Sequence, residues 1–191
     1  MLHLRSTGPL LLLSAALLAF PHAASAGCPC SDRVLASNPD PEAVVWAFRD
    51  AFVHQDLEAY AALLADDYVF RFRPDDVEPG MPDTLNRAGE LDFARHLFQG
   101  GAASGAPPAE HISLRIEILG RQAEMRAGGI RWAKFALMTH LRAYLKGGGL
   151  YQVDSPVTFL VRREGAEAGT WRLVEWVELT PAATPEFAGR P

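Results

Sequence analysis

The chain has 191 residues, a formal net charge of −5 at pH 7 and only two cysteines, and 49% of its residues are hydrophobic. This length suffices for a single domain that buries its own apolar core without disulfides to hold it. The negative balance argues against nucleic acid as a partner, because binding to phosphates requires a clustered basic surface.

The first 39 residues are expected to precede the folded domain. Arg5 is followed by an apolar run from Leu10 to Phe20 and by Ala24-Ser25-Ala26, small residues at the spacing that a signal peptidase recognises. A run of about 11 apolar residues is too short to span a bilayer. We therefore predict a signal peptide over 1–26, a tether over 27–39 and a periplasmic or secreted protein.

Cys28 leaves two forms of the exported protein open. Ala26-Gly27-Cys28 matches the end of a bacterial lipoprotein cleavage box, in which case a lipid on Cys28 would be the protein's membrane attachment. Ser25 stands where such boxes usually carry an aliphatic residue, which favours a protein without lipid. A bridge from Cys28 to Cys30 would close a strained ring, so we expect no disulfide in the core.

The stretch from Asp56 to Arg73 changes its hydrophobic period halfway. Its first half has apolar residues at helical spacing, and its second half alternates as a strand does. We predict a helix over 57–65 that ends at Asp66-Asp67, followed by a strand over 68–73. Three rings leave this strand on one face, towards a preceding helix: those of Tyr68, Phe70 and Phe72.

The remaining elements are predicted from capping residues and from periodicity. Asp40 and Pro41 are typical of a helix start, and the helix is expected to end near His54. Residues 130–145 contain good helix formers, but their alternation and the glycine turn that follows favour a strand. The other expected elements are a loop over 74–86, a helix over 87–99, strands over 111–119, 151–163 and 171–179, and a loose tail over 182–191.

Two segments resemble a known superfamily. AVVWAFRDAFVHQDLEAYAALLADDYVF (residues 43–70) is similar to the opening of nuclear transport factor 2-like proteins, a group that includes SnoaL-like polyketide cyclases and steroid Δ5-isomerases. WRLVEWVEL (residues 171–179) is similar to their final strand. The resemblance implies one domain over 40–181 of the α+β class. A curved, mixed, mainly antiparallel sheet would wrap around three N-terminal helices in a cystatin-like cone with a deep apolar pocket.

The steroid isomerase branch implies which positions would be catalytic. Its tyrosine falls on Phe48, its first aspartate on Phe72 and its second aspartate near Val157. None of these side chains polarises a carbonyl group or moves a proton. The resemblance therefore implies a chain without steroid isomerase activity, and it favours a protein that is not an enzyme.

Two sets of residues are candidates for a functional site. Aromatic residues of the first two helices and the first strand would line a pocket for a flat apolar molecule, or would simply form the core. These are Trp46, Phe48, Phe52, Tyr60, Tyr68, Phe70 and Phe72. An acid–base group of His140, Asp154 and Glu175 would lie on neighbouring strands, or these residues would occupy a solvated sheet face.

Two classes of function remain open after these observations. The first is an exported domain that binds a small apolar ligand or a protein partner. The second is a lyase, isomerase or hydrolase that uses His140, Asp154 or Glu175 in the same cone. We expect no metal, since His54 and His96 lack partners at metal-ligand spacing. No cofactor is expected, and a homodimer is an expectation from the resemblance alone.

Overall fold

The computed structural model describes residues 40–100, 107–127, 130–164 and 169–180. The expected signal peptide, the tether with Cys28 and the tail over 182–191 lie outside these residues. The described residues form three α-helices and six β-strands. In chain order these are α2 (Glu42–Val53), α3 (Leu57–Leu63), β1 (Leu64–Arg71), β2 (Thr84–Asn86), α4 (Arg87–Gln99), β3 (Ala109–Ala127), β4 (Ile130–Leu145), β5 (Leu150–Glu164) and β6 (Thr170–Glu178).

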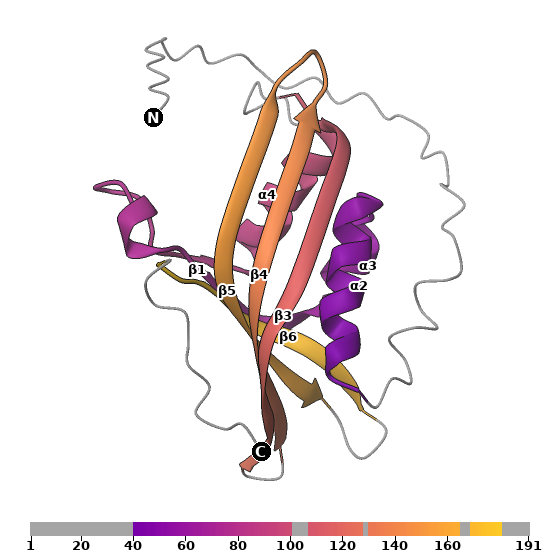
Figure 1. The fold of residues 1–191 in the computed structure, drawn as a ribbon, viewed down its shortest axis with the longest axis vertical. Coiled ribbons are helices and arrows are strands. Elements are labelled where there is room, and N and C mark those ends of the chain that lie inside the picture. The colour runs from indigo at the N-terminus through magenta and orange to yellow at the C-terminus, as the bar shows by residue number, and fades with distance from the viewer. Residues whose placement is uncertain (1–39, 101–106, 128–129, 165–168, 181–191) are drawn as a thin grey trace, which may run out of the picture.

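The six strands form one sheet in the order β2-β1-β6-β5-β4-β3. The β1–β6 pair is parallel, whereas every other neighbouring pair in the described sheet is antiparallel. In Figure 1 the long strands β3, β4 and β5 run side by side, with α4 behind them and α2 and α3 beside β3. The predicted fold class, helices packed against a mixed and mainly antiparallel sheet, is confirmed.

The core lies between the helices and one face of the sheet. On α2 the predicted stripe of Val45, Phe48 and Phe52 is buried, as is expected for residues three or four apart on a helix. The helix begins where the carboxylate of Asp40 accepts a hydrogen bond of 3.1 Å from the backbone N–H of Glu42. None of the helices in the described residues is long and apolar enough to cross a membrane.

The passage from α3 into β1 differs from the prediction. The helix ends at Leu63, and Leu64 already has extended backbone angles, so Asp66-Asp67 lie inside the strand and do not end the helix. The rings of Tyr68 and Phe70 are buried, and that of Phe72 is half-buried against the core, as predicted.

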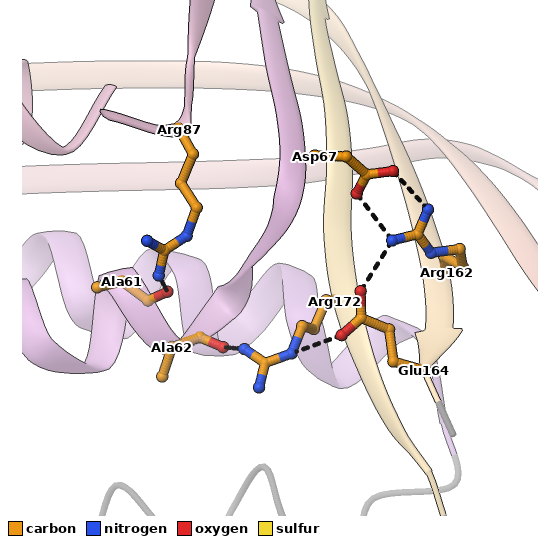
Figure 2. A network of polar contacts seen from close by, with 7 residues as sticks. All are labelled: Ala61, Ala62, Asp67, Arg87, Arg162, Glu164 and Arg172. Carbon is orange, nitrogen blue, oxygen red and sulfur yellow. Dashed lines mark hydrogen bonds and ion pairs between the residues drawn. The ribbon is translucent and has the colours of Figure 1, made fainter. Parts of the chain in front are cut away.

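Arginines from distant elements explain this abrupt ending. The last carbonyl groups of a helix lack partners within it. Figure 2 shows Arg87 donating to the carbonyl of Ala61, at 2.9 Å, and Arg172 donating to that of Ala62. These arginines come from α4 and β6, so sequence periodicity near the junction could not indicate the early end.

The same network continues to the far strands. Arg162 on β5 makes two hydrogen bonds of 2.8 Å with the carboxylate of Asp67 and one of 2.8 Å with Glu164, and Arg172 pairs with Glu164 at 3.1 Å. The hydrogen bonds from Arg162 lower the pKa of Asp67. The network therefore joins β1, β5 and β6 to the end of α3 (Figure 2).

Two further predicted boundaries are wrong. Part of the expected loop over 74–86 is the strand β2, which pairs with the C-terminal end of β1. The strand expected over 111–119 extends through Ala127, because β4 offers it pairing partners along its whole length, with irregular register after Ile118. The strand predicted over 130–145 and the helix predicted over 87–99 have the expected boundaries.

Candidate ligand-binding cavity

A cavity of about 510 Å³ lies between the helices and the inner face of the sheet. This volume is within the range of small-molecule sites, about 300–1,000 Å³. Seven aromatic residues contribute to its walls: Phe48 and Phe52 from α2, Phe70 from β1, Phe72 after β1, Phe93 from α4, Tyr151 from β5 and Trp176 from β6. The aromatic core therefore leaves a hollow that it does not fill.

Of the seven aromatic residues predicted to bind a ligand, Phe48, Phe52, Phe70 and Phe72 line this cavity. The other three do not line it. Tyr60 and Tyr68 are buried in the core, and the indole N–H of Trp46 donates to Glu42 at 3.0 Å on the surface of α2.

The positions that correspond to steroid isomerase catalytic residues lie in two environments. Phe48 and Phe72 are among the residues that line the cavity. Val157 is fully buried within the hydrophobic core. At all three positions the side chain is a hydrocarbon and supplies no group for proton transfer.

Trp176 joins several of these rings into one wall. Its indole lies 4.9 Å from the ring of Phe70 and 5.2 Å from that of Phe48, both in edge-to-face geometry. The indole N–H has no hydrogen-bond partner among the described residues. Burial of an unpaired donor costs free energy, which a hydrogen-bond acceptor on a ligand within reach would recover.

Glu90 is a buried carboxyl group in the wall of the cavity. Its side chain comes from α4, is only 3% exposed, and accepts a hydrogen bond of 2.6 Å from the hydroxyl of Tyr60. Burial raises the pKa of Glu90 to about 7, with the hydrogen bond from Tyr60 acting to lower it and the nearby charge of Glu178 adding to the increase. Near neutral pH this carboxyl group exists in both protonation states.

The chain between β1 and β2 and the end of β6 carry charged groups that also line the cavity. Arg73 and Asp76 form an ion pair of 2.6 Å, so their charges compensate each other. Glu178 has no ion pair of this kind among the described residues, and burial raises its pKa. Arg73 acts against this effect of burial, because its charge and a backbone hydrogen bond from it lower the pKa of Glu178. Glu90 is therefore the buried carboxyl group in the cavity wall that no cationic side chain of the described residues compensates.

The mouth of the cavity lies where β5 continues past the end of β6. Pairing between these strands stops at Val157 and Glu178, whereas residues 151–155 of β5 extend beyond and line the cavity. Two of the large side chains that line it, Phe93 and Tyr151, are 42% and 43% exposed. These two rings therefore belong to the part of the cavity lining that is open to solvent.

His140 on β4 and Asp154 on β5 lie directly opposite each other, on neighbouring strands as predicted. The imidazole Nδ1 lies 2.6 Å from a carboxylate oxygen of Asp154, and Gln152 donates to the other oxygen at 2.8 Å. Hydrogen bonds from Gln152 and then from His140 lower the pKa of Asp154. Asp154 is among the residues that line the cavity, whereas His140 is not.

Glu175 lies apart from this pair. It faces Leu160 on β5, six residues from Asp154, which corresponds to about 20 Å along a strand. Its carboxylate pairs instead with Arg71 at 2.7 Å on the exposed side of β1. A catalytic role for His140, Asp154 and Glu175 stays a prediction, and the structure does not bring all three residues together.

Among the residues that the structure describes, no group of three or more His, Cys, Asp or Glu side chains has the arrangement of a metal site. His96 lies 3.6 Å from Asp92 on α4, and His54 makes a contact of 2.8 Å with the backbone carbonyl of Asp50. Neither histidine lines the cavity.

The most informative cavity residue, Glu90, was missing from the sequence-based candidates. A signal for it exists, because Glu90 is four residues before Ala94 and eight before Phe98, on the stripe that α4 turns to the core. A carboxylate within an apolar stripe is unusual and indicates either a buried partner or a site. Trp176 and Glu178 alternate on the last strand, but only the tertiary structure brings them to the cavity.

Comparisons with known proteins give fold relatives only. No family model and no curated protein matches the chain. Solved structures with similar folds include a nuclear transport factor 2-like protein of unknown function in nutrient uptake from Rhodospirillum rubrum. It has 18% sequence identity and a TM-score of 0.49, and the match covers 73% of this chain and 96% of that chain.

Two further structures show the same kind of likeness. A ketosteroid isomerase-like protein from Erwinia carotovora atroseptica has 19% identity and a TM-score of 0.46, covering 73% of this chain and 94% of that one. A protein with a cystatin-like fold from Caulobacter vibrioides has 16% identity and a TM-score of 0.44, covering 74% and 89%. These likenesses concern the fold alone. The fold and the cavity together define an α+β domain with a cavity between its helices and its sheet.

Proposed function

We propose that this protein binds a small, largely apolar molecule in the cavity between its helices and sheet. The observation that carries the proposal is a cavity of about 510 Å³ with seven aromatic residues in its walls. A hollow of this kind loses the contacts that side chains would make in a filled core, and an apolar ligand restores them. Export to the periplasm is part of the proposal and rests on residues 1–26 alone.

The polar groups at the cavity would orient such a ligand. Most of the wall is aromatic or aliphatic, whereas Glu90 contributes a carboxyl group and Thr139 and Ser155 contribute hydroxyl groups. Burial of most of the ligand against rings supplies affinity, and a few placed polar groups supply specificity. A ligand with one polar end and an apolar body fits this distribution.

Mass spectrometry of copurifying molecules tests the proposal. The protein is expressed in a bacterial periplasm, purified without detergent and extracted, alongside the Leu141→Trp variant, which places an indole in the cavity. We expect a small apolar molecule in stoichiometric amount with wild type and much less with the variant. Equal amounts on both proteins would place the molecule outside the cavity and contradict the proposal.

A second candidate is an enzyme of lyase, isomerase or hydrolase type that uses the same cavity. The observation in its favour is Glu90, because burial raises the pKa of this carboxyl group to about 7, where a group both accepts and releases protons. The molecules recovered from wild type and from Glu90→Gln distinguish the candidates. Different compounds on the two proteins support turnover, and the same compound on both supports binding alone.

A further inference from the structure

We propose that the ligand of this cavity is a lipophilic cation, an amine or quaternary ammonium group attached to an apolar body. This inference deepens the proposed function and rests on it. It names the ligand class from the charges and rings that face the cavity.

The first argument is the balance of charge around the hollow. Arg73 is the only cationic side chain among the described residues that line it, and Asp76 already compensates Arg73 at 2.6 Å. Glu90 has no ion pair within the described part of the chain, whereas Arg73 partly compensates Glu178. Buried charges are normally paired, so a cationic group on the ligand would supply the missing partner.

The second argument is the aromatic character of the walls. Ring faces carry negative potential, and a cation near them is stabilised, most strongly near tryptophan and where water is excluded. Phe48 and Phe70 each contact Trp176, and all three rings line the cavity that Glu90 also lines. Aromatic side chains together with a carboxylate are the combination by which proteins recognise quaternary ammonium groups.

The third argument is the state of Glu90 itself. One of its oxygens accepts the bond from Tyr60, and the other accepts none from the described residues. The residues that line the cavity with Glu90, or that act on it, include one cationic side chain, Arg73, which already pairs with Asp76 at 2.6 Å. The uncharged residues of this set are Phe48 and Phe52 on α2, Tyr60 on α3, Tyr68 and Phe70 on β1, Leu114 on β3, Thr139 and Leu141 on β4, and Tyr151 on β5. The charged residues are Asp154 on β5, Glu178 on β6, and Arg73 and Asp76 in the chain after β1.

The proposal predicts that binding of a cation releases a proton. A cation favours the ionised form of Glu90, so affinity rises with pH through the range where Glu90 ionises. With the pKa of Glu90 at about 7, the affinity for a permanent cation would increase up to about tenfold from pH 6 to pH 8.

Two probes of equal shape make the test direct. Phenyltrimethylammonium carries a charge that does not depend on pH, and tert-butylbenzene has carbon in place of its nitrogen. Calorimetric titration of the full mature protein with each probe, at pH 6 and pH 8, compares charge at constant size. Glu90→Gln removes the carboxylate, and Glu117→Gln makes the same change on the exposed outer face of β3 as a matched control.

We expect wild type and Glu117→Gln to bind the cation about tenfold more tightly than the hydrocarbon at pH 8. Glu90→Gln should lose this preference and the pH dependence while it still binds the hydrocarbon. If the hydrocarbon binds as well as the cation, the inference is overturned and the proposed function stands. If neither probe binds wild type, the proposed function is overturned as well.

Discussion

At the scale of single residues, burial of a carboxyl group costs free energy unless the group is protonated or paired. Glu90 has a hydroxyl partner in Tyr60 and no cationic one among the described residues. The folded protein therefore holds a proton on Glu90 at pH values where the unfolded chain has released it. This difference in protonation makes the free energy of unfolding depend on pH, and a substitution of Glu90 removes that dependence.

Glu90→Gln should change the pH dependence of stability. Because the folded-state pKa of Glu90 is raised from 4.5 to about 7, its contribution is fully present below about pH 4.5 and is lost as pH rises through 7. The free energy of unfolding of wild type should fall over this window by on the order of 3 kcal/mol more than that of the variant. Urea unfolding followed by circular dichroism between pH 5 and pH 8 measures this difference. An equal change of the free energy of unfolding with pH in wild type and variant would contradict it.

Tyr60→Phe and Tyr68→Phe form a matched pair around the same carboxyl group. The hydroxyl of Tyr60 bonds to Glu90 and lowers its pKa, whereas that of Tyr68 has no hydrogen-bond partner among the described residues. Tyr60→Phe should raise the pKa of Glu90 further and destabilise the fold at pH 8 by about 1–3 kcal/mol. Tyr68→Phe should be neutral or slightly stabilising. A carbon-13 NMR titration of the Glu90 carboxyl group measures its pKa in each variant. The same pKa of Glu90 in Tyr60→Phe and Tyr68→Phe would refute the prediction.

At the scale of elements, the passage from α3 to β1 has no loop, so its stability depends on side chains from elsewhere. Arg87 and Arg172 satisfy the helix carbonyls, and Arg162 holds Asp67 on the strand that follows (Figure 2). Phe70 near the end of β1 and Phe72 directly after it line the cavity. We therefore expect the arginine network to position the wall as well as to end the helix.

Arg172→Met tests the role of the network. The substitution leaves the carbonyl of Ala62 and the carboxylate of Glu164 without this donor, and should reduce the free energy of unfolding by about 1–3 kcal/mol. Arg95→Met is the control, because Arg95 pairs only with the exposed Asp92 on α4 and should cost under about 1 kcal/mol. Chemical denaturation measures both values. Equal losses in the two variants would show that the network does not hold the junction.

At the scale of the whole molecule, the sequence predicted the layers better than the site. Alternation and helical spacing report which face of an element is buried, so β4, β5, β6 and α4 were predicted within a residue of their ends. The early end of α3 was missed because its carbonyl partners are distant in sequence. The role of Glu90 was missed because periodicity shows that a position faces inward, and not whether a hollow remains beside it.

Self-association also belongs to this scale. The expectation of a homodimer through the outer sheet face stays a prediction. The described outer face includes charged groups, among them Arg115 and Glu117 on β3. Sedimentation velocity at several concentrations tests the expectation, and a single species of monomer mass throughout would contradict it.

A substitution that fills the hollow should abolish binding without unfolding the protein. Leu141 lines the cavity, so Leu141→Trp should weaken the binding of tert-butylbenzene at least about tenfold by occupying its space. Leu119→Trp is the control, because Leu119 is exposed on β3. Calorimetric titration measures both affinities. Unchanged affinity in Leu141→Trp would place the hydrocarbon outside the cavity.

The most direct measurement of the central claim is a crystal structure of the mature protein grown with bromobenzene, with data collected at the bromine absorption edge. An apolar molecule of this size enters a hollow that is dry and accessible. The account predicts an anomalous bromine peak within the cavity, beside Phe48, Phe70 and Trp176. A map with no peak among these rings, from crystals in which bromine is found only at the outer surface, would contradict the claim that this cavity binds a ligand.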